Sequence, residues 1–368
     1  MRVDSLRIFT GPKPEDVERI PILRQRDDDD VASTIPNQYS DGEKIWQVPF
    51  QSPRWVRLSD NDHFAYNNFF RLRFYLPESP ASQLFIMTNG FSEGVVEVWD
   101  RLGATFAKAG VGAVLLPLPQ HYSRNVLFHI NDYHETDHYI VNKTALKSYN
   151  AGLTYGFLRR PELLAEFDGQ IMEDVKELMR AVTSRTGSSH AMNDFTRSHF
   201  SENVEVSVLG FSLGGLVALQ AFLSQPDRYH SCVLINSGAS FQDMNASQVF
   251  KEHWRSLQRA ILAKTRGVTS LPADFAEVFL GHEKVMLLHR LEQHKNKLLI
   301  IIGGSDAIFN MSNIANILPR ETGLAVFQIP GLGHFINIPK LGGDIWTEWS
   351  RFTANMILSF NTHRPGAE

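Results

Sequence analysis

A serine in a glycine-rich turn is the strongest chemical signal in this sequence. Ser212 stands within GFSLG at 210–214, directly after the apolar stretch VEVSVL and at the start of LGGLVALQAFL. A G-x-S-x-G pattern between a strand and a helix is typical of a nucleophile elbow, a sharp turn that exposes the serine hydroxyl. We interpret Ser212 as a nucleophile. The alternative is a glycine-rich turn that carries an incidental serine.

The neighbours of Ser212 fit this interpretation. A sharp strand-to-helix turn requires very small residues two positions before and after the serine, where the sequence has Gly210 and Gly214. The turn also places the hydroxyl at the positive end of the following helix, which favours negative charge developing nearby.

A serine hydroxyl needs a base to take its proton at neutral pH. His334 stands within GLGHF at 331–335, directly after the last predicted strand, and the glycines would let the imidazole reach over the elbow. The alternative is a histidine of the surface or the core.

Such a base needs an acid that fixes its tautomer. Asp306 ends GGSD at 303–306, which follows the apolar run KLLIII, and the order Ser, Asp, His along the chain is the order of α/β-hydrolases. Asp306 could instead be a turn residue or the N-cap of a helix at 312–318. Asp243 is the reserve candidate for the acid.

The elements around these residues alternate between strands and helices. Antiparallel strands are expected at 43–50 and 67–77, buried strands at 83–90, 110–119, 204–210, 230–238, 297–304 and 324–331, and helices at 94–109, 171–182, 213–223 and 344–360. This alternation predicts an α/β fold with a mostly parallel, doubly wound sheet, and ligands bind such sheets at the carboxyl ends of their strands.

From about residue 43 to 360 the chain resembles the α/β-hydrolase superfamily, and within it the serine esterases and thioesterases with a cap. The matching pieces are the elbow, GGSD, GLGH and a turn after QLFIMT. At that turn the family commonly has His-Gly-x, whereas this chain has Asn89-Gly90-Phe91. The resemblance implies an oxyanion hole built from the backbone N–H groups of Phe91 and Leu213.

Two interruptions complete the predicted organisation. The resemblance implies that 241–296 is a helical cap, inserted between the two parts of the core at 43–240 and 297–368. A second insertion at 119–168 is rich in histidine and tyrosine, and it is either a wall beside the substrate or a packed surface loop. We expect no metal there, because the spacing matches no metal motif and no cysteine joins it. Residues 1–42 are interpreted as a partly mobile N-terminal extension.

The bulk properties exclude several classes of protein. A net charge of −4 and a pI of about 6.4 argue against nucleic acid or an anionic membrane surface as the partner. No apolar run has the length of a membrane span, and the N-terminus lacks the apolar core of a secretory signal. One cysteine, Cys232, excludes an internal disulfide, so we expect a cytoplasmic protein.

These observations predict a serine hydrolase that needs no cofactor and cleaves an ester or thioester of a small or medium-sized metabolite through an acyl-enzyme. Two alternatives stay open. One is an acyltransferase with the same three residues, and the other is a ligand-binding protein of this fold that does not turn over. The expected partner is a small acyl substrate, and a homo-oligomer is left open.

Overall fold

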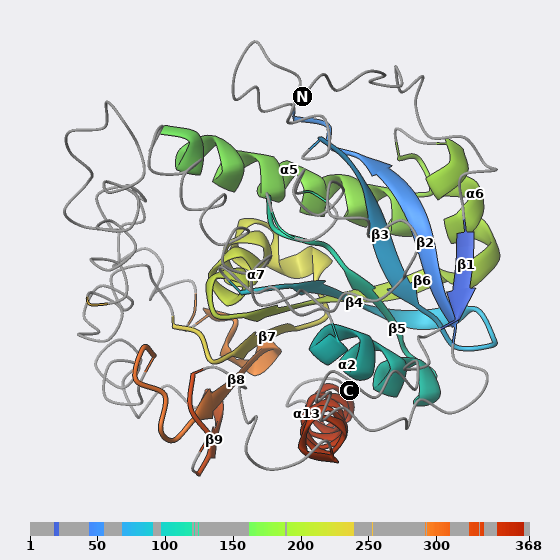
Figure 1. Cartoon of the computed structure of the whole chain (residues 1–368). Coiled ribbons are helices and arrows are strands. Elements are labelled where there is room, and N and C mark those ends of the chain that lie inside the picture. Colours follow the sequence, from blue (N-terminus) through green and yellow to red (C-terminus); the bar gives the residue numbers. More distant parts are fainter. Residues whose placement is uncertain are drawn as a thin grey trace, which may run out of the picture.

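One mixed sheet with helices on both faces forms the described part of the chain (Figure 1). The computed structural model describes residues 18–21, 44–54, 68–90, 97–119, 121, 124, 162–187, 190–238, 252, 291, 293–309, 324–330, 332–334 and 344–363. The fold, the site and the inferences below concern these residues.

The strands are β1 Glu18–Pro21, β2 Lys44–Gln51, β3 Phe69–Tyr75, β4 Ala81–Thr88, β5 Gly112–Leu115, β6 Phe200–Phe211, β7 Cys232–Ile235, β8 Leu298–Gly303 and β9 Ala325–Ile329. The α-helices are α2 Glu97–Lys108, α5 Glu162–Thr183, α6 His190–His199, α7 Leu213–Ser224 and α13 Asp344–Thr362, and short 3₁₀ turns occupy Pro226–Arg228 and Lys295–Lys297.

The strand order across the sheet is β1-β2-β3-β5-β4-β6-β7-β8-β9. The first three strands pair antiparallel with one another, and β3 pairs antiparallel with β5. From β5 to β9 every pairing is parallel. The prediction of a mostly parallel, doubly wound sheet with antiparallel strands at its start is therefore confirmed.

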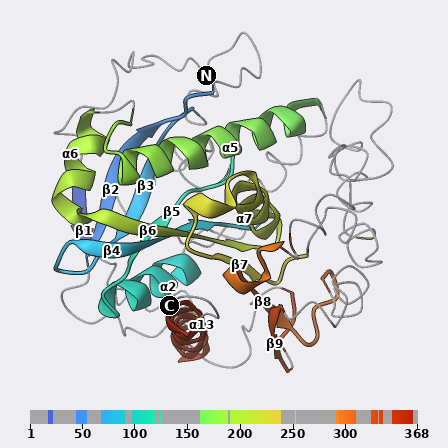
Figure 2. The same cartoon turned by 180° about the vertical axis from the view of Figure 1, so that it is seen from behind.

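Both faces of the central parallel strands are buried, as crossover helices require, whereas the edge strand β9 is partly exposed. Helices α5, α6 and α7 cover one face, while α2 and α13 cover the other (Figure 2). Side chains of the central strands alternate between the two apolar clusters. The first cluster includes Leu84, Ile86, Val206, Val208, Leu234 and Ile300, and the second includes Phe85, Met87, Leu209, Val233 and Ile301. This alternation explains why the strands appear in the sequence as continuous apolar runs.

The helix expected at 171–182 is confirmed as part of α5. Its apolar residues at helical spacing all lie in the cluster beneath α5, α6 and α7, namely Ile171, Val175, Leu178, Met179 and Val182. The helix itself is longer than expected, because it begins at Glu162, inside the stretch interpreted as an insertion. Cys232 is a fully buried residue of β7, as its place in an apolar run suggested.

Two elements had no counterpart in the sequence interpretation. The four residues of β1 extend the sheet beyond β2, although they lie in the predicted N-terminal extension. Helix α6 lies in what was interpreted as a polar connection. It packs through Phe195, whose ring lies 5.7 Å from that of Trp46 and 5.0 Å from that of Phe74. Helix α6 has only ten residues, few of them apolar, so it leaves a short apolar pattern in the sequence.

A buried ion pair ties the beginning of the 119–168 stretch to α5. Arg124 donates to the Asp174 carboxylate at 2.8 Å and to the Pro117 carbonyl at 3.1 Å, and both charged side chains are fully buried. The guanidinium also lies 4.2 Å from the centroid of the Phe70 ring. Because a buried pair without its partner is costly, these contacts specify how the chain leaves β5.

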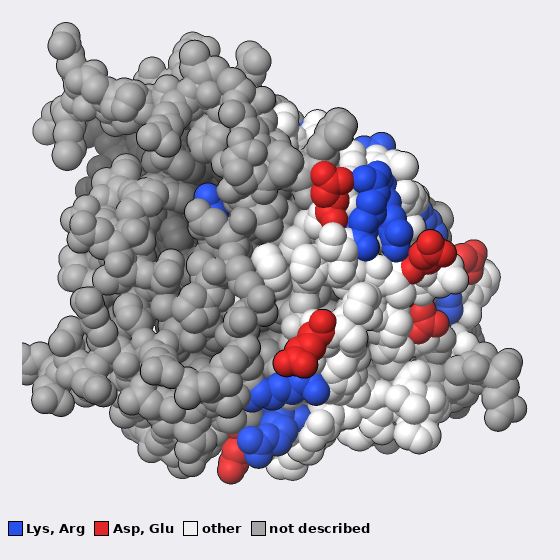
Figure 3. Space-filling view, turned by 90° about the vertical axis from the view of Figure 1, so that its right-hand side faces the viewer, with Lys and Arg blue, Asp and Glu red and all other residues white. Residues whose placement is uncertain are grey.

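The described surface carries charges of both signs (Figure 3). On the face seen in Figure 3, basic and acidic residues stand side by side on the described surface. None of the helices in the described part of the chain combines the length and apolarity that a membrane crossing requires.

Candidate active site

The turn between β6 and α7 holds Ser212 in a strained conformation. Ser212 has φ 52° and ψ −118°, and it lies at the N-terminal end of α7. Its N–H donates to the Ile235 carbonyl at 3.0 Å, and its carbonyl accepts the Ser237 hydroxyl at 2.7 Å. Residues other than glycine rarely adopt a positive φ, so the hydrogen bonds around Ser212 must hold the turn in this conformation.

The glycines of the turn are sterically required. A Cβ on Gly210 would lie 2.1 Å from the carbonyl oxygen of Gly214, and a Cβ on Gly214 would lie 2.3 Å from the carbonyl oxygen of Thr88. Both distances are far below a van der Waals contact. The small neighbours expected of a nucleophile elbow are therefore present for the expected steric reason.

The structure brings Ser212, His334 and Asp306 together. His334 Nε2 lies 3.0 Å from Ser212 Oγ, and His334 Nδ1 lies 2.9 Å from Asp306 Oδ2. All three residues are nearly buried, with exposed fractions of 5%, 6% and 3% in the order Ser, His, Asp. This is the geometry in which an imidazole can take a proton from a hydroxyl while a carboxylate holds its other nitrogen.

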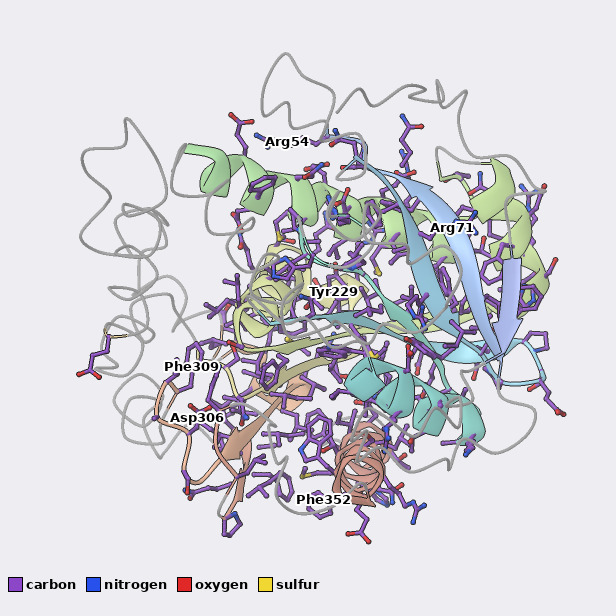
Figure 4. All side chains as sticks on the ribbon, in the orientation of Figure 1. Arg54, Arg71, Tyr229, Asp306, Phe309 and Phe352 are labelled. Carbon is purple, nitrogen blue, oxygen red and sulfur yellow. The ribbon has the colours of Figure 1, made fainter. Side chains whose placement is uncertain are left out.

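The Asp306 carboxylate has a second set of partners. Its Oδ1 atom accepts the backbone N–H of Ile308 at 2.8 Å and that of Phe309 at 2.9 Å. Figure 4 labels Asp306 and Phe309 beside each other, beyond the end of β8. Asp306 is thus also a turn residue, so the two interpretations of this residue are compatible. One oxygen organises the turn, and the other is left for His334.

Two aromatic rings pack near the imidazole of His334. The ring centroid of Phe211 lies 5.5 Å from that of His334, and the ring centroid of Phe309 lies 5.7 Å from it. The His334 side chain is buried, and a buried hydrogen bond is electrostatically stronger than one in water.

One residue that sequence reasoning missed links the loops of the site. Asn236 directly follows β7, is fully buried and has φ 44°. Its side chain bonds to the ends of two other loops, at Gly303 and at Gly333 and His334. The only sequence signal was an asparagine at the carboxyl end of a buried strand, which is also a common turn residue.

The turn after β4 lies against the elbow. The Thr88 hydroxyl donates to the Gly214 carbonyl at 2.8 Å, and Asn89 Oδ1 accepts the Leu118 N–H at 2.9 Å. A Cβ on Gly90 would lie 2.8 Å from the Phe211 ring. Phe91, one of the two expected oxyanion residues, lies outside the described residues. Leu213, the other, begins α7, where backbone N–H groups have no acceptor within the helix.

Most of the two predicted insertions lies outside the described residues, as does Asp243. Of the histidine and tyrosine cluster in 119–168, His121 is described. Its Nδ1 lies 2.9 Å from the Pro119 carbonyl oxygen, and burial lowers its pKa to about 4. The ring is therefore neutral at pH 7, and its Nδ1–H donates to that carbonyl.

Comparison with protein families gives one match. The model of a family described as "Putative esterase" matches residues 178–350, a range that contains Ser212, Asp306 and His334. Among curated proteins, no sequence matches this chain.

Solved structures align with most of this chain at low identity. The esterase domain of a Rhodothermus marinus protein is 10% identical, with a TM-score of 0.45, and the alignment covers 85% of this chain and 97% of that one. An S-formylglutathione hydrolase from Agrobacterium tumefaciens is 13% identical, with a TM-score of 0.43, over 89% of this chain and 97% of that one. TT1662 from Thermus thermophilus is 14% identical, with a TM-score of 0.42, over 80% of this chain and 95% of that one. With TM-scores this low, none of these likenesses carries an argument about fold or activity.

Proposed function

We propose that this chain, an ester-hydrolysing enzyme with the α/β-hydrolase fold, acts through Ser212 as nucleophile, His334 as base and Asp306 as the acid that orients the base. The observation that carries the proposal is the placement of His334, which lies within hydrogen-bond distance of the Ser212 hydroxyl and the Asp306 carboxylate at once. Three residues from separate loops form a hydrogen-bonded series of hydroxyl, imidazole and carboxylate, which is the arrangement that acyl transfer needs.

In the proposed reaction, Ser212 Oγ attacks the ester carbonyl carbon while its proton passes to His334 Nε2. The resulting oxyanion would accept hydrogen bonds from the backbone N–H groups of Leu213 and Phe91. The tetrahedral intermediate collapses, and the imidazolium gives its proton to the leaving alkoxide or thiolate. A water molecule then attacks the acyl-enzyme with the same base, which releases the acid and restores Ser212.

The substrate is proposed to be an ester or thioester of a small or medium-sized metabolite, with no cofactor or metal required. This part of the proposal rests on the resemblance to capped family members and on the buried position of Ser212, which disfavours a polymer. Transfer of the acyl group to an alcohol or amine would use the same residues, so assays with and without such acceptors decide between hydrolysis and transfer.

The proposed setting is the cytoplasm. The single cysteine, Cys232, is buried in β7 and can form no internal disulfide. The partner is then a small acyl compound rather than nucleic acid or a membrane, and a homo-oligomer is compatible with the proposal.

The test is labelling with a fluorophosphonate, which reacts with an activated serine, read by intact mass. We expect one label per wild-type chain, none on Ser212→Ala, and full labelling of Ser231→Ala as the matched control. The Ser231 hydroxyl is buried and bonded to that of Ser207 at 2.9 Å, away from the elbow. A folded wild-type protein that takes up no label, or that is labelled equally after Ser212→Ala, would contradict the proposal.

A further inference from the structure

Asn236 lies at the end of β7, between β6, which leads to the proposed nucleophile, and β8, which leads to the proposed acid. It follows the last residue of β7, its N–H donates to the Ile301 carbonyl of β8 at 2.8 Å, and it is fully buried. Its φ of 44° lies in the left-handed region, which asparagine tolerates better than most residues. The backbone therefore presents the side chain at the carboxyl end of the sheet, where the site lies.

Three hydrogen bonds of the Asn236 carboxamide join two loops. Oδ1 accepts the N–H of Gly303, the last residue of β8, at 2.7 Å. Nδ2 donates to the carbonyls of Gly333 and His334, at 3.0 Å each. An N–H can pair only with the oxygen and a carbonyl only with the amide nitrogen, so the neighbours determine the orientation of the carboxamide.

These bonds connect the base to the strand that carries the acid. Asp306 belongs to the turn that begins at Gly303, since the Asp306 N–H donates to the Gly303 carbonyl at 3.0 Å. A backbone bond from the Ser305 N–H to the Leu332 carbonyl, at 2.9 Å, joins the same two loops. Asn236 adds the contact to His334 itself, on the main chain that bears the imidazole.

We propose that Asn236 is a positioning residue, which holds the His334 main chain at the distance from Asp306 and Ser212 that proton transfer requires. The inference rests on the proposed function, because it assigns Asn236 a role through His334. Asn236 touches no reacting atom in this mechanism. Its effect on the rate is indirect: a shift of about 1 Å in a catalytic group lowers the rate on the order of 10²-fold, and Asn236 prevents such a shift of His334.

Two substitutions separate this role from simple support of the fold. Asn236→Asp keeps the shape and the tolerance of a positive φ, yet places an oxygen against the carbonyls of Gly333 and His334, so both donated bonds are lost. Asn236→Gly adopts φ 44° without strain and removes the whole carboxamide. The second variant keeps the test valid if the first folds poorly.

The matched control is Asn193→Asp. The Asn193 carboxamide also brackets main chain, accepting the Gly187 N–H at 2.7 Å and donating to the Gly187 carbonyl at 2.8 Å, but it lies on α6, which covers one face of the sheet away from the elbow. Asn193→Asp therefore makes the same chemical change in a carboxamide that also bonds to the main chain, but at a position outside the proposed active site.

The assay measures kcat and KM for 4-nitrophenyl acetate, with rates divided by the concentration of serine titrated by the fluorophosphonate. A loss of folded protein then does not count as a loss of rate. We expect kcat to fall about 10- to 100-fold in both Asn236 variants with KM changed less than about threefold, while the control keeps the wild-type kcat.

A proton NMR readout reports the geometry directly. The proton between His334 Nδ1 and Asp306 should resonate far downfield in the wild type and in Asn193→Asp, and should shift or broaden in the Asn236 variants. Wild-type kcat per titrated serine and an unmoved downfield signal in either folded Asn236 variant would overturn the inference. A wild-type protein without esterase activity or labelling would instead refute the proposed function, so the two failures are distinguishable.

Discussion

Replacement of Asp306 by asparagine tests the role of the proposed acid, because the structure determines which way the new carboxamide must face. Asp306 Oδ1 holds the N–H groups of Ile308 and Phe309, which can bond only to an oxygen. In Asp306→Asn the amide oxygen must take that place, so the amide nitrogen faces His334 Nδ1. Since this nitrogen is a donor, Nδ1 must become the acceptor, and the imidazole proton moves to Nε2. His334 Nε2, 3.0 Å from Ser212 Oγ, then cannot accept the hydroxyl proton.

The expected magnitude follows from the wrong tautomer. In a Ser-His-Asp site this error lowers kcat by about 10⁴, or about 5 kcal/mol in the activation barrier. Stability should change much less, by about 1–2 kcal/mol, because the two bonds of the turn persist and only the charge of their acceptor is lost. Asp306→Ala removes the turn bonds too, so it should lose activity to a similar degree and more stability.

The assay is hydrolysis of 4-nitrophenyl acetate together with the rate of fluorophosphonate labelling, with urea unfolding measured on the same preparations. The reasoning predicts a folded Asp306→Asn protein that is almost inactive. If this variant keeps kcat within about tenfold of the wild type, Asp306 does not fix the tautomer of His334. Asp243 would then be the next residue to replace.

Two other predictions concern the elbow and the beginning of the 119–168 stretch. In Gly214→Ala the new Cβ would lie 2.3 Å from the Thr88 carbonyl oxygen, so the turn must shift. We expect the free energy of unfolding to fall by about 3 kcal/mol and the rate of fluorophosphonate labelling at Ser212 to fall by about 10²-fold. Gly333→Ala is the control and should change stability little in urea unfolding, because among the described residues the atom nearest to its Cβ would be the Ser305 carbonyl oxygen, at 4.0 Å. His121 has its pKa lowered by burial from 6.5 to about 4, so the unfolded state binds the extra proton first and stability falls as pH drops from 6.5 towards 4. His121 should account for about 3 kcal/mol of that fall at its lower end, and His121→Asn should flatten the urea-unfolding profile over this range. An unchanged profile would place the acid sensitivity elsewhere.

Local patterns in the sequence were enough to predict the sheet and most of its helices. The strands β4, β5, β7 and β8 are continuous apolar runs because both of their faces are buried, and α5 shows its apolar residues at helical spacing. Helix α6 was missed because it has only ten residues and few of them are apolar. The packing of Phe195 against Trp46 and Phe74, more than 100 residues earlier in the chain, could be seen only in the folded structure.

For the site, the sequence identified the residue types and the order of Ser212, Asp306 and His334, because a turn at a strand's end leaves a local pattern of glycines. Their roles stay a proposal, but their meeting is a fact of the tertiary structure. Asn236 could not be found this way, because its function depends on three bonds to residues 67 to 98 positions away. Short sequence motifs can identify residues that are suited to catalysis. Which of these motifs lie side by side depends on the register of neighbouring parallel strands, and that register exists only in the folded sheet.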